Sequence, residues 1–277
     1  MTTVLKLGGE LLEDAGAVAR AAGAIAREAA RGPLVVVHGG GRAIDAELRL
    51  RGLEPQFVDG LRITDGPALD AAIGVLAGRT NTALVAALAA AGVRAVGLTG
   101  ADGLIGLSSR ADSFRSVAGD DVDLGLVGQP RGTDMSLLRD LLALGYVPVI
   151  ASIGVTAAGE LLNVNADTLA GHLAAALGAG ALIVAGGTAG VLDEDGITVT
   201  QLSAAEIDAM IASGAAHSGM IAKLAACRVA LAAGVAHVTI VTGRDVLDYA
   251  GAAGTRLQGA SPAFETTFDP QPKGAVS

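Results

Sequence analysis

The chain has 277 residues, of which 51% are hydrophobic, 17% are charged and 2% are aromatic. This length suits one large α/β domain or two lobes that share a cleft, with a core of Ala, Leu, Val and Ile. The net charge of −9 and the scarcity of aromatic residues argue against a nucleic-acid partner, which needs a basic face and rings for stacking. The single cysteine, Cys227, and the lack of a targeting-peptide pattern predict a cytoplasmic protein.

Short β-branched runs alternate along the chain with stretches rich in Ala and Leu. The expected strands span residues 3–7, 34–37, 94–98, 147–151, 181–185 and 237–241, and the expected helices span 15–30, 67–91, 134–144, 167–177 and 218–233. This alternation predicts βαβ units and an α/β fold, a three-layer sandwich with a mainly parallel central sheet and two lobes. In this single 1–277 domain we expect an N-lobe over about 1–170, a C-lobe over about 171–261 and a loosely ordered tail over 262–277.

Two regions depart from this alternation. Residues 102–129 carry Asp, Ser, Gly and scattered Val, which favours a small β excursion or hairpins. Residues 168–192 contain no Asp, Glu, Lys or Arg and are long enough to span a membrane. Glycines divide that segment, so we expect a helix, a turn, a short strand and a loop instead of a membrane helix.

Polar residues that directly follow strands are the candidates for chemistry, because ligands of open α/β sheets bind beyond the carboxyl ends of the strands. The first strand ends with Lys6 and is followed by Gly8 and Gly9. An unpaired ammonium inside a sheet is costly, so Lys6 is expected to face a wet or anionic cleft. The alternative is a lysine that extends its ammonium to solvent at a sheet edge.

The second strand leads into His38 and three glycines, Gly39 to Gly41, before a helix that begins near residue 43. Glycines allow backbone N–H groups and a helix N-terminus to approach an anion closely. The run matches neither the Walker pattern nor Gly-x-Gly-x-x-Gly. A plain tight turn is the alternative.

Arg62 lies among turn residues and can hold a carboxylate through its two-pronged guanidinium, or it can simply pair with Asp59 or Asp65. Asn163 and Asp167 precede and open a helix expected near residue 168. They either order a polar site or provide an N-cap at Asp167.

Lys223 lies on the flank of the apolar stripe of the helix that begins at residue 218. This position permits a solvated lysine or one that reaches into a cleft.

Taken in order, these motifs resemble the amino acid kinase family, and most closely its acetylglutamate kinase members. The resemblance covers the chain from Lys6 to about Gly259, and any one motif would be weak without the others. The matching stretches are Lys-Leu-Gly-Gly at 6–9, His-Gly-Gly-Gly at 38–41, Gly-Leu-Arg-Ile-Thr at 60–64, Leu-Ala-Gly at 76–78, Gly-Tyr-Val-Pro-Val-Ile-Ala-Ser-Ile-Gly-Val-Thr at 145–156, Asn-Val-Asn-Ala-Asp at 163–167 and Gly-Met-Ile-Ala-Lys at 219–223.

The resemblance implies phosphoryl transfer from ATP, with Mg²⁺ and no prosthetic group, to the side-chain carboxylate of N-acetyl-L-glutamate, a step of arginine synthesis. A carboxylate that titrates near about 4.3 is already ionised at neutral pH, so the reaction needs no general base. It needs alignment and charge neutralisation instead.

The resemblance also implies roles for individual residues. Lys6 and Lys223 would stabilise the transferring phosphoryl group, and Asp167 would orient both lysines. The residues implied to contact phosphate or substrate are Gly8, Gly9, Gly40, Gly41, Arg62 and Asn163. The residues implied to bind nucleotide are Gly187, Thr188, Gly190, Val191, Leu192, Ala215 and His217. No residue is implied to be a dedicated metal ligand.

The chain departs from the family pattern in two places. Relatives carry a Ser- or Thr-Asp-Val turn where this chain has Gly186, Gly187 and Thr188, so nucleotide affinity is expected to differ. Arginine-inhibited members carry a helix before the first strand, whereas Met1 lies only a few residues before Lys6. We therefore expect a homodimer formed through the N-lobes that is insensitive to arginine.

Two other functions remain open at this point. One is a kinase for an acylated α-aminoadipate in lysine synthesis, since one methylene is worth only about 1–3 kcal/mol of discrimination. The other is a non-catalytic amino-acid- or nucleotide-binding regulatory protein. The presence of Lys6, Asp167 and Lys223 disfavours it, while the departure at Gly187 leaves it open.

Overall fold

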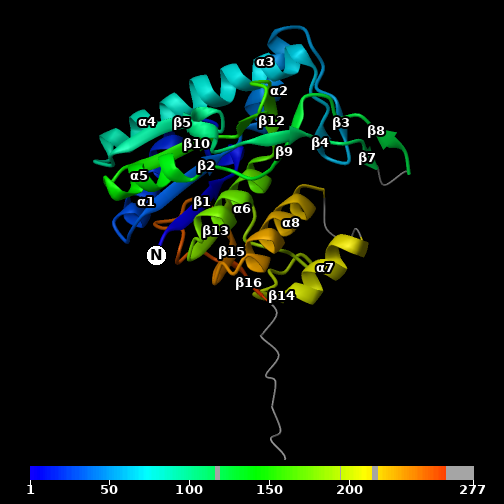
Figure 1. The fold of residues 1–277 in the computed structure, drawn as a ribbon. Coiled ribbons are helices and arrows are strands. Elements are labelled where there is room, and N and C mark those ends of the chain that lie inside the picture. The colour runs from blue at the N-terminus through cyan, green and yellow to red at the C-terminus, as the bar shows by residue number, and fades with distance from the viewer. Residues whose placement is uncertain (116–118, 194, 214–217, 260–277) are drawn as a thin grey trace, which may run out of the picture.

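The computed structural model describes residues 1–115, 119–193, 195–213 and 218–259. Its centre is an eight-stranded sheet with the order β14-β16-β15-β13-β1-β2-β10-β5 (Figure 1). The strands are β1 (Thr3–Leu7), β2 (Leu34–His38), β5 (Ala95–Thr99), β10 (Val147–Ala151), β13 (Ala181–Gly186), β14 (Gln201–Ser203), β15 (His237–Thr242) and β16 (Gly254–Gln258). All neighbouring pairs are parallel except β15 and β16, so the predicted, mainly parallel sheet is confirmed.

Helices cover both faces of this sheet and form the three layers that the sequence predicts. The helices are α1 (Ala15–Ala29), α2 (Gly41–Leu50), α3 (Gly66–Ile73), α4 (Asn81–Ala90), α5 (Ser136–Ala143), α6 (Ala166–Leu177), α7 (Ala204–Ser213) and α8 (Ser218–Ala232). Helices α1 and α4 pack on the face that carries Leu5 and Leu7. Helices α5, α6 and α8 pack on the opposite face with Val4 and Val184. Strand residues alternate between faces, so Lys6 shares the α6 and α8 face with Val4.

The expected β excursion at 102–129 is confirmed. A second sheet has the order β11-β12-β9-β6, and it is built from β6 (Ser108–Arg110), β9 (Val127–Pro130), β11 (Ile153–Val155) and β12 (Leu161–Val164). Two small hairpins pair β3 (Phe57–Val58) with β4 (Leu61–Arg62), and β7 (Phe114–Arg115) with β8 (Asp121–Val122). Short 3₁₀ turns form η1 (Gly9–Leu11) and η3 (Asp102–Leu104).

The two apolar segments of the chain behave differently. Residues 168–192 divide into most of α6, a turn and strand β13, as predicted. The helical run Gly66–Ala90 instead passes the test for a membrane span by length and composition. It comprises α3, the π-helical segment η2 (Gly74–Thr80) and α4, and 39% of its most apolar window is buried inside the fold. Buried core helices pass the same test, and Leu84 and Leu88 pack into the core beneath α1.

The boundary expected between the lobes, near residue 170, falls within α6. Strand β1, in the expected N-lobe, is paired along its whole length with β13, in the expected C-lobe. The carboxyl ends of β1, β2 and β13 therefore lie side by side (Figure 1), and the turns that follow them meet beyond this end of the sheet.

Candidate functional site

The candidate site is a cleft of about 270 Å³ beyond the carboxyl ends of β1 and β2. Most of the sequence-predicted substrate and phosphate residues line it. They include Lys6, Gly9, Gly40, Gly41, Arg62, Asn163 and Asp167. These residues come from six separate elements, so their convergence is a property of the sheet order and not of local sequence.

Lys6 and Asp167 form a buried ion pair at the base of the cleft. Lys6 Nζ lies 2.9 Å from Asp167 Oδ1, and the two side chains are 6% and 9% exposed. The alternative of a lysine that reaches solvent at a sheet edge is therefore wrong. Oδ1 accepts no aligned hydrogen bond from the described residues, so this oxygen retains capacity for a second donor.

The start of α6 explains why Asp167 is available to Lys6. The N-cap is Asn165, whose side-chain oxygen accepts hydrogen bonds from the backbone N–H groups of Asp167 and Thr168 at 2.9 and 3.1 Å. An N-cap at Asp167 is thus wrong by two residues. Asp167 lies in the first helical turn, where the helix dipole stabilises a carboxylate.

Two glycine turns touch at the edge of the cleft. A Cβ on Gly9 would lie 2.6 Å from Gly40 Cα, and a Cβ on Gly40 would lie 2.8 Å from Leu76 Cδ2. Glycine at these positions therefore allows the ends of β1 and β2 to meet. Gly8 differs, because its N–H donates to Ala185 O at 2.8 Å within the sheet and is not directed at the cleft.

His38 lies beneath the glycine run and is completely buried. Its Nε2 lies 3.1 Å from Asn81 Nδ2, which also donates to Val149 O at 2.9 Å. Because the amide nitrogen is a donor, Nε2 is the acceptor, and the ring proton resides on Nδ1, 3.3 Å from Gly39 O. Burial lowers the pKa of His38 to about 4, so the ring is neutral.

Arg62 enters the cleft from β4 and does not pair with Asp59 or Asp65, as the sequence allowed. Its Nη2 donates to Asp45 Oδ1 at 2.5 Å and to Gly41 O at 3.2 Å, and its guanidinium lies 4.6 Å above the Phe57 ring. Its Nη1 is buried with no hydrogen-bond partner among the described residues. The two N–H groups of Nη1 are therefore available to a ligand.

Asn163, on β12, donates from Nδ2 to Thr64 Oγ1 at 3.1 Å, and Thr64 is fully buried. The amide oxygen of Asn163 is thereby oriented opposite this bond, in the wall of the cleft. Sequence reasoning missed the support from Thr64, although this residue belongs to the same Gly-Leu-Arg-Ile-Thr motif as Arg62.

Lys223 lies on α8 with its Cε 3.6 Å from where a Cβ on Gly186 would be, at the end of β13. Its Nζ donates to Gly219 O at 3.3 Å within its own helix and does not pair with Asp167 in this structure. Of the two lysines that Asp167 is expected to orient, it contacts Lys6 in this structure.

The expected nucleotide segment has mixed surroundings. Gly187 donates its N–H to Glu10 Oε1 at 2.8 Å, and the hydroxyl of Thr188 donates to Gly190 O at 3.3 Å. Gly190 has a φ of 95°, and Val191 is buried with its N–H donating to Thr255 Oγ1 at 2.8 Å. Gly190 and Val191 thus hold this loop against β16. Leu192 is 42% exposed, and Ala215 and His217 lie outside the described residues.

Sequence reasoning also missed Glu10, which borders the cleft and follows the Gly8 and Gly9 turn directly. An acid immediately after a glycine turn at a strand end was the signal that could have identified it.

Known proteins resemble this chain in sequence and in fold. A model of the amino acid kinase family matches residues 1–242. An acetylglutamate kinase from Symbiobacterium thermophilum is 44% identical over 214 residues, 76% of this chain and 73% of the relative. One from Methanoculleus marisnigri is 40% identical over 247 residues, 87% of this chain and 86% of the relative. The structure of an N-acetylglutamate synthase from Neisseria gonorrhoeae, complexed with coenzyme A and N-acetyl-glutamate, is 26% identical with a TM-score of 0.79, and the match covers 95% of this chain and 60% of that chain.

Proposed function

Because the chain belongs to the amino acid kinase family, we propose that it transfers the γ-phosphoryl group of ATP to the side-chain carboxylate of N-acetyl-L-glutamate. The product is N-acetyl-L-glutamyl 5-phosphate, and the reaction is a step of arginine synthesis. The observation that carries this proposal is a buried Lys6–Asp167 pair in the same cleft as the unpartnered Nη1 of Arg62. One end of the cleft can neutralise a phosphoryl group, and the other can hold a carboxylate.

Lys6 supplies the positive charge on the N-lobe side of the transferring group. Its ammonium is fixed by Asp167 before substrate binds, so little reorganisation is needed when charge spreads over the phosphoryl oxygens. Lys223 supplies the second charge from α8. Its present bond to Gly219 O is a single weak contact of a half-buried side chain, which the ammonium can exchange for a phosphate oxygen or for Asp167 Oδ1.

The substrate is held by groups that the structure orients in advance. Arg62 presents Nη1 to the α-carboxylate, because Asp45 and Phe57 already fix the rest of its guanidinium. Asn163 presents its amide oxygen to the acetylamino N–H. We assign the N–H groups of Gly9, Gly40 and Gly41, which line the cleft, to the reacting carboxylate and the incoming phosphoryl group.

The proposed nucleotide is ATP with Mg²⁺. Among the residues that the structure describes, no group of three or more His, Cys, Asp or Glu side chains is arranged to hold a metal ion. Of the two acids that border the cleft, Asp167 is paired with Lys6 and Glu10 accepts the Gly187 N–H, so these residues fit an ion that the nucleotide phosphates carry. When bound, Mg²⁺ neutralises charge on the β- and γ-phosphates.

We also propose a homodimer formed through the N-lobe. Strand β5 ends the eight-stranded sheet, and with α4 it borders a hollow of about 400 Å³ lined by Val85, Ala86, Gly97 and Leu98. An open strand edge beside an apolar helix face can pair with a second copy of the same chain. The molar mass of the protein in solution tests this proposal, with Ala86→Glu as the disrupting variant. We place the enzyme in the cytoplasm, where its buried free thiol at Cys227 stays reduced.

An acyl hydroxamate assay with ATP, acetylglutamate and hydroxylamine tests the activity directly. We expect hydroxamate with acetylglutamate and a lower kcat/KM with an acylated α-aminoadipate. If no hydroxamate forms while ATP is bound, the chain is not this kinase. If the longer acid is the better substrate, the reaction class stands and the substrate assignment is wrong.

A further inference from the structure

Glu10 holds a backbone group that a nucleotide phosphate would be expected to use. Its carboxylate crosses from the turn after β1 to the turn after β13, where Oε1 accepts the Gly187 N–H at 2.8 Å. The carboxylate also lies directly above Gly8, since a Cβ there would meet both carboxylate oxygens at 2.4 to 2.5 Å. An internal anion therefore occupies a strand-end N–H of the kind that binds phosphate.

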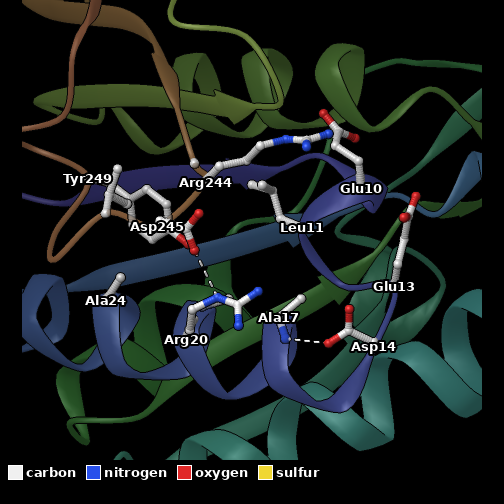
Figure 2. Close-up of a pocket in the computed structure, with 13 residues that line it drawn as sticks. Glu10, Leu11, Glu13, Asp14, Ala17, Arg20, Ala24, Arg244, Asp245 and Tyr249 are labelled. Carbon is white, nitrogen blue, oxygen red and sulfur yellow. Dashed lines mark hydrogen bonds and ion pairs between the residues drawn. The ribbon is translucent and has the colours of Figure 1, made fainter.

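The guanidinium of Arg244 also lies next to Gly187. Arg244 follows β15, and its Nε and Nη2 lie 3.3 Å from where a Cβ on Gly187 would be, with Glu10 Cγ at 3.4 Å. Figure 2 shows the Arg244 guanidinium directed toward the Glu10 carboxylate at the top of a cavity of about 200 Å³. Within the described part of the chain, no hydrogen bond or ion pair engages this guanidinium.

This spot adjoins the phosphoryl-transfer end of the cleft. Glu10 Oε1 and Lys223 Cε lie 3.3 and 3.6 Å from the same Cβ position on Gly186. Glu10 also borders the cleft that contains Lys6 and Asp167. One backbone donor, one arginine and one of the two lysines thus surround a single carboxylate.

We propose that Gly187 N–H and the Arg244 guanidinium form a phosphate subsite for the nucleotide, and that Glu10 occupies it until the nucleotide displaces its carboxylate. This inference rests on the proposed kinase function and adds two residues, Glu10 and Arg244, that set nucleotide affinity. The charge of Glu10 opposes the phosphate, and the charge of Arg244 attracts it. Arg244 also offers the displaced carboxylate a partner.

A purely structural role for Glu10 predicts something different. If Glu10 only braced the turn after β13, a glutamine would serve equally well, because its amide oxygen accepts the same Gly187 N–H. Glu10→Gln keeps that hydrogen bond and removes the charge. The substitution therefore distinguishes a purely structural role of Glu10 from competition between its carboxylate and the nucleotide phosphate.

The experiment is calorimetric titration of ADP and of adenosine into the full-length wild type and its variants. We expect Glu10→Gln to lower the Kd for ADP by about three- to tenfold, as loss of one like-charge contact at a partly exposed site allows. We expect Arg244→Ala to raise this Kd by about tenfold, as for the loss of one charged hydrogen bond. The Kd of Arg244→Lys should lie between those of the wild type and Arg244→Ala. Binding of adenosine should not change, and raising the salt concentration should shrink the effect of Glu10→Gln.

Glu13→Gln and Arg20→Ala are the matched controls. Both residues line the same cavity (Figure 2), but Glu13 pairs with Arg42 and Arg20 pairs with Asp245. Neither control should alter the Kd for ADP. An unchanged or weaker ADP affinity in Glu10→Gln overturns the proposal, as does an Arg244→Ala variant that binds ADP normally. Failure of the kinase function would be distinct, because the wild type itself would then give no hydroxamate.

Discussion

Lys6 Nζ lies 2.9 Å from Asp167 Oδ1, and both side chains are more than nine-tenths buried. Burying two charges is repaid only by close pairing, and the loss of one partner leaves the other charge uncompensated. The pair joins β1 to the first turn of α6, so it links the sheet to the helix layer at the reacting end of the cleft.

Asp167→Asn should therefore affect both stability and turnover. We expect the free energy of unfolding to fall by about 3–5 kcal/mol, because the Lys6 ammonium is left buried without an anion. Urea denaturation monitored by circular dichroism measures this change. Thr168→Ala, one residue along the same helix, is the control and should cost far less. If the free energy of unfolding fell equally in the two variants, the Lys6–Asp167 ion pair would contribute no more to stability than the Thr168 side chain does.

Lys223→Ala should separate catalysis from stability. Lys223 is only half buried, and its ammonium bonds only to Gly219 O among the described residues. We expect kcat to fall by about a hundredfold or more, with little change in either KM or in the melting temperature, since its charge acts in the transition state. Steady-state kinetics and thermal melting of the same preparation test both parts. A variant with unchanged kcat would remove Lys223 from the mechanism.

Arg62→Ala should change substrate binding rather than the chemical step. The unpartnered Nη1 is assigned to the substrate carboxylate, so we expect KM for acetylglutamate to rise by about tenfold or more. The KM for ATP should stay within about twofold. Arg42→Ala is the matched control, because Arg42 is exposed on the neighbouring helix and pairs with Glu13. If Arg62→Ala raised only the KM for ATP, the two ends of the cleft would be assigned in reverse.

His38 should make stability depend on pH between about 4 and 6.5. Burial holds the folded-state pKa of His38 near 4, below the ordinary value of 6.5, so the unfolded chain binds the extra proton in that window. The contribution of neutral His38 to the free energy of unfolding is complete above pH 6.5 and is lost as the pH falls toward 4. The full loss is about 3 kcal/mol, from about 1.4 kcal/mol per unit of pKa.

Urea titrations at pH 7.5, 6.0 and 5.0 measure this dependence. His38→Gln should be less stable than the wild type at pH 7.5 but should show a flatter pH profile, because it lacks the titrating ring. Parallel profiles for the two proteins would contradict the assignment of this pH dependence to His38.

Much of the site follows from local sequence. Lys6 sits at the end of an apolar run, the glycines follow two strands, and Asn163 and Asp167 open a helix, so their positions at strand and helix ends are readable from periodicity alone. The six expected strands appear within one residue of their predicted ends. The helix expected over 67–91 is the less accurate case, because it consists of α3, η2 and α4. A π-helical segment changes the turn of a helix without interrupting its apolar character, so composition does not reveal it.

The α/β class, the parallel strands, the glycine turns and the positions of the two lysines can be predicted from local sequence, because each depends on residues within a few positions of one another. Which charged side chains pair with each other depends instead on how the chain folds in three dimensions. The tertiary structure paired Arg62 with Asp45 and not with its sequence neighbours. It also brought Glu10 to Gly187 across 177 residues of chain. The physical reason is the sheet order: β13 lies beside β1, so the turns after the two strands become neighbours, and no local pattern encodes that adjacency.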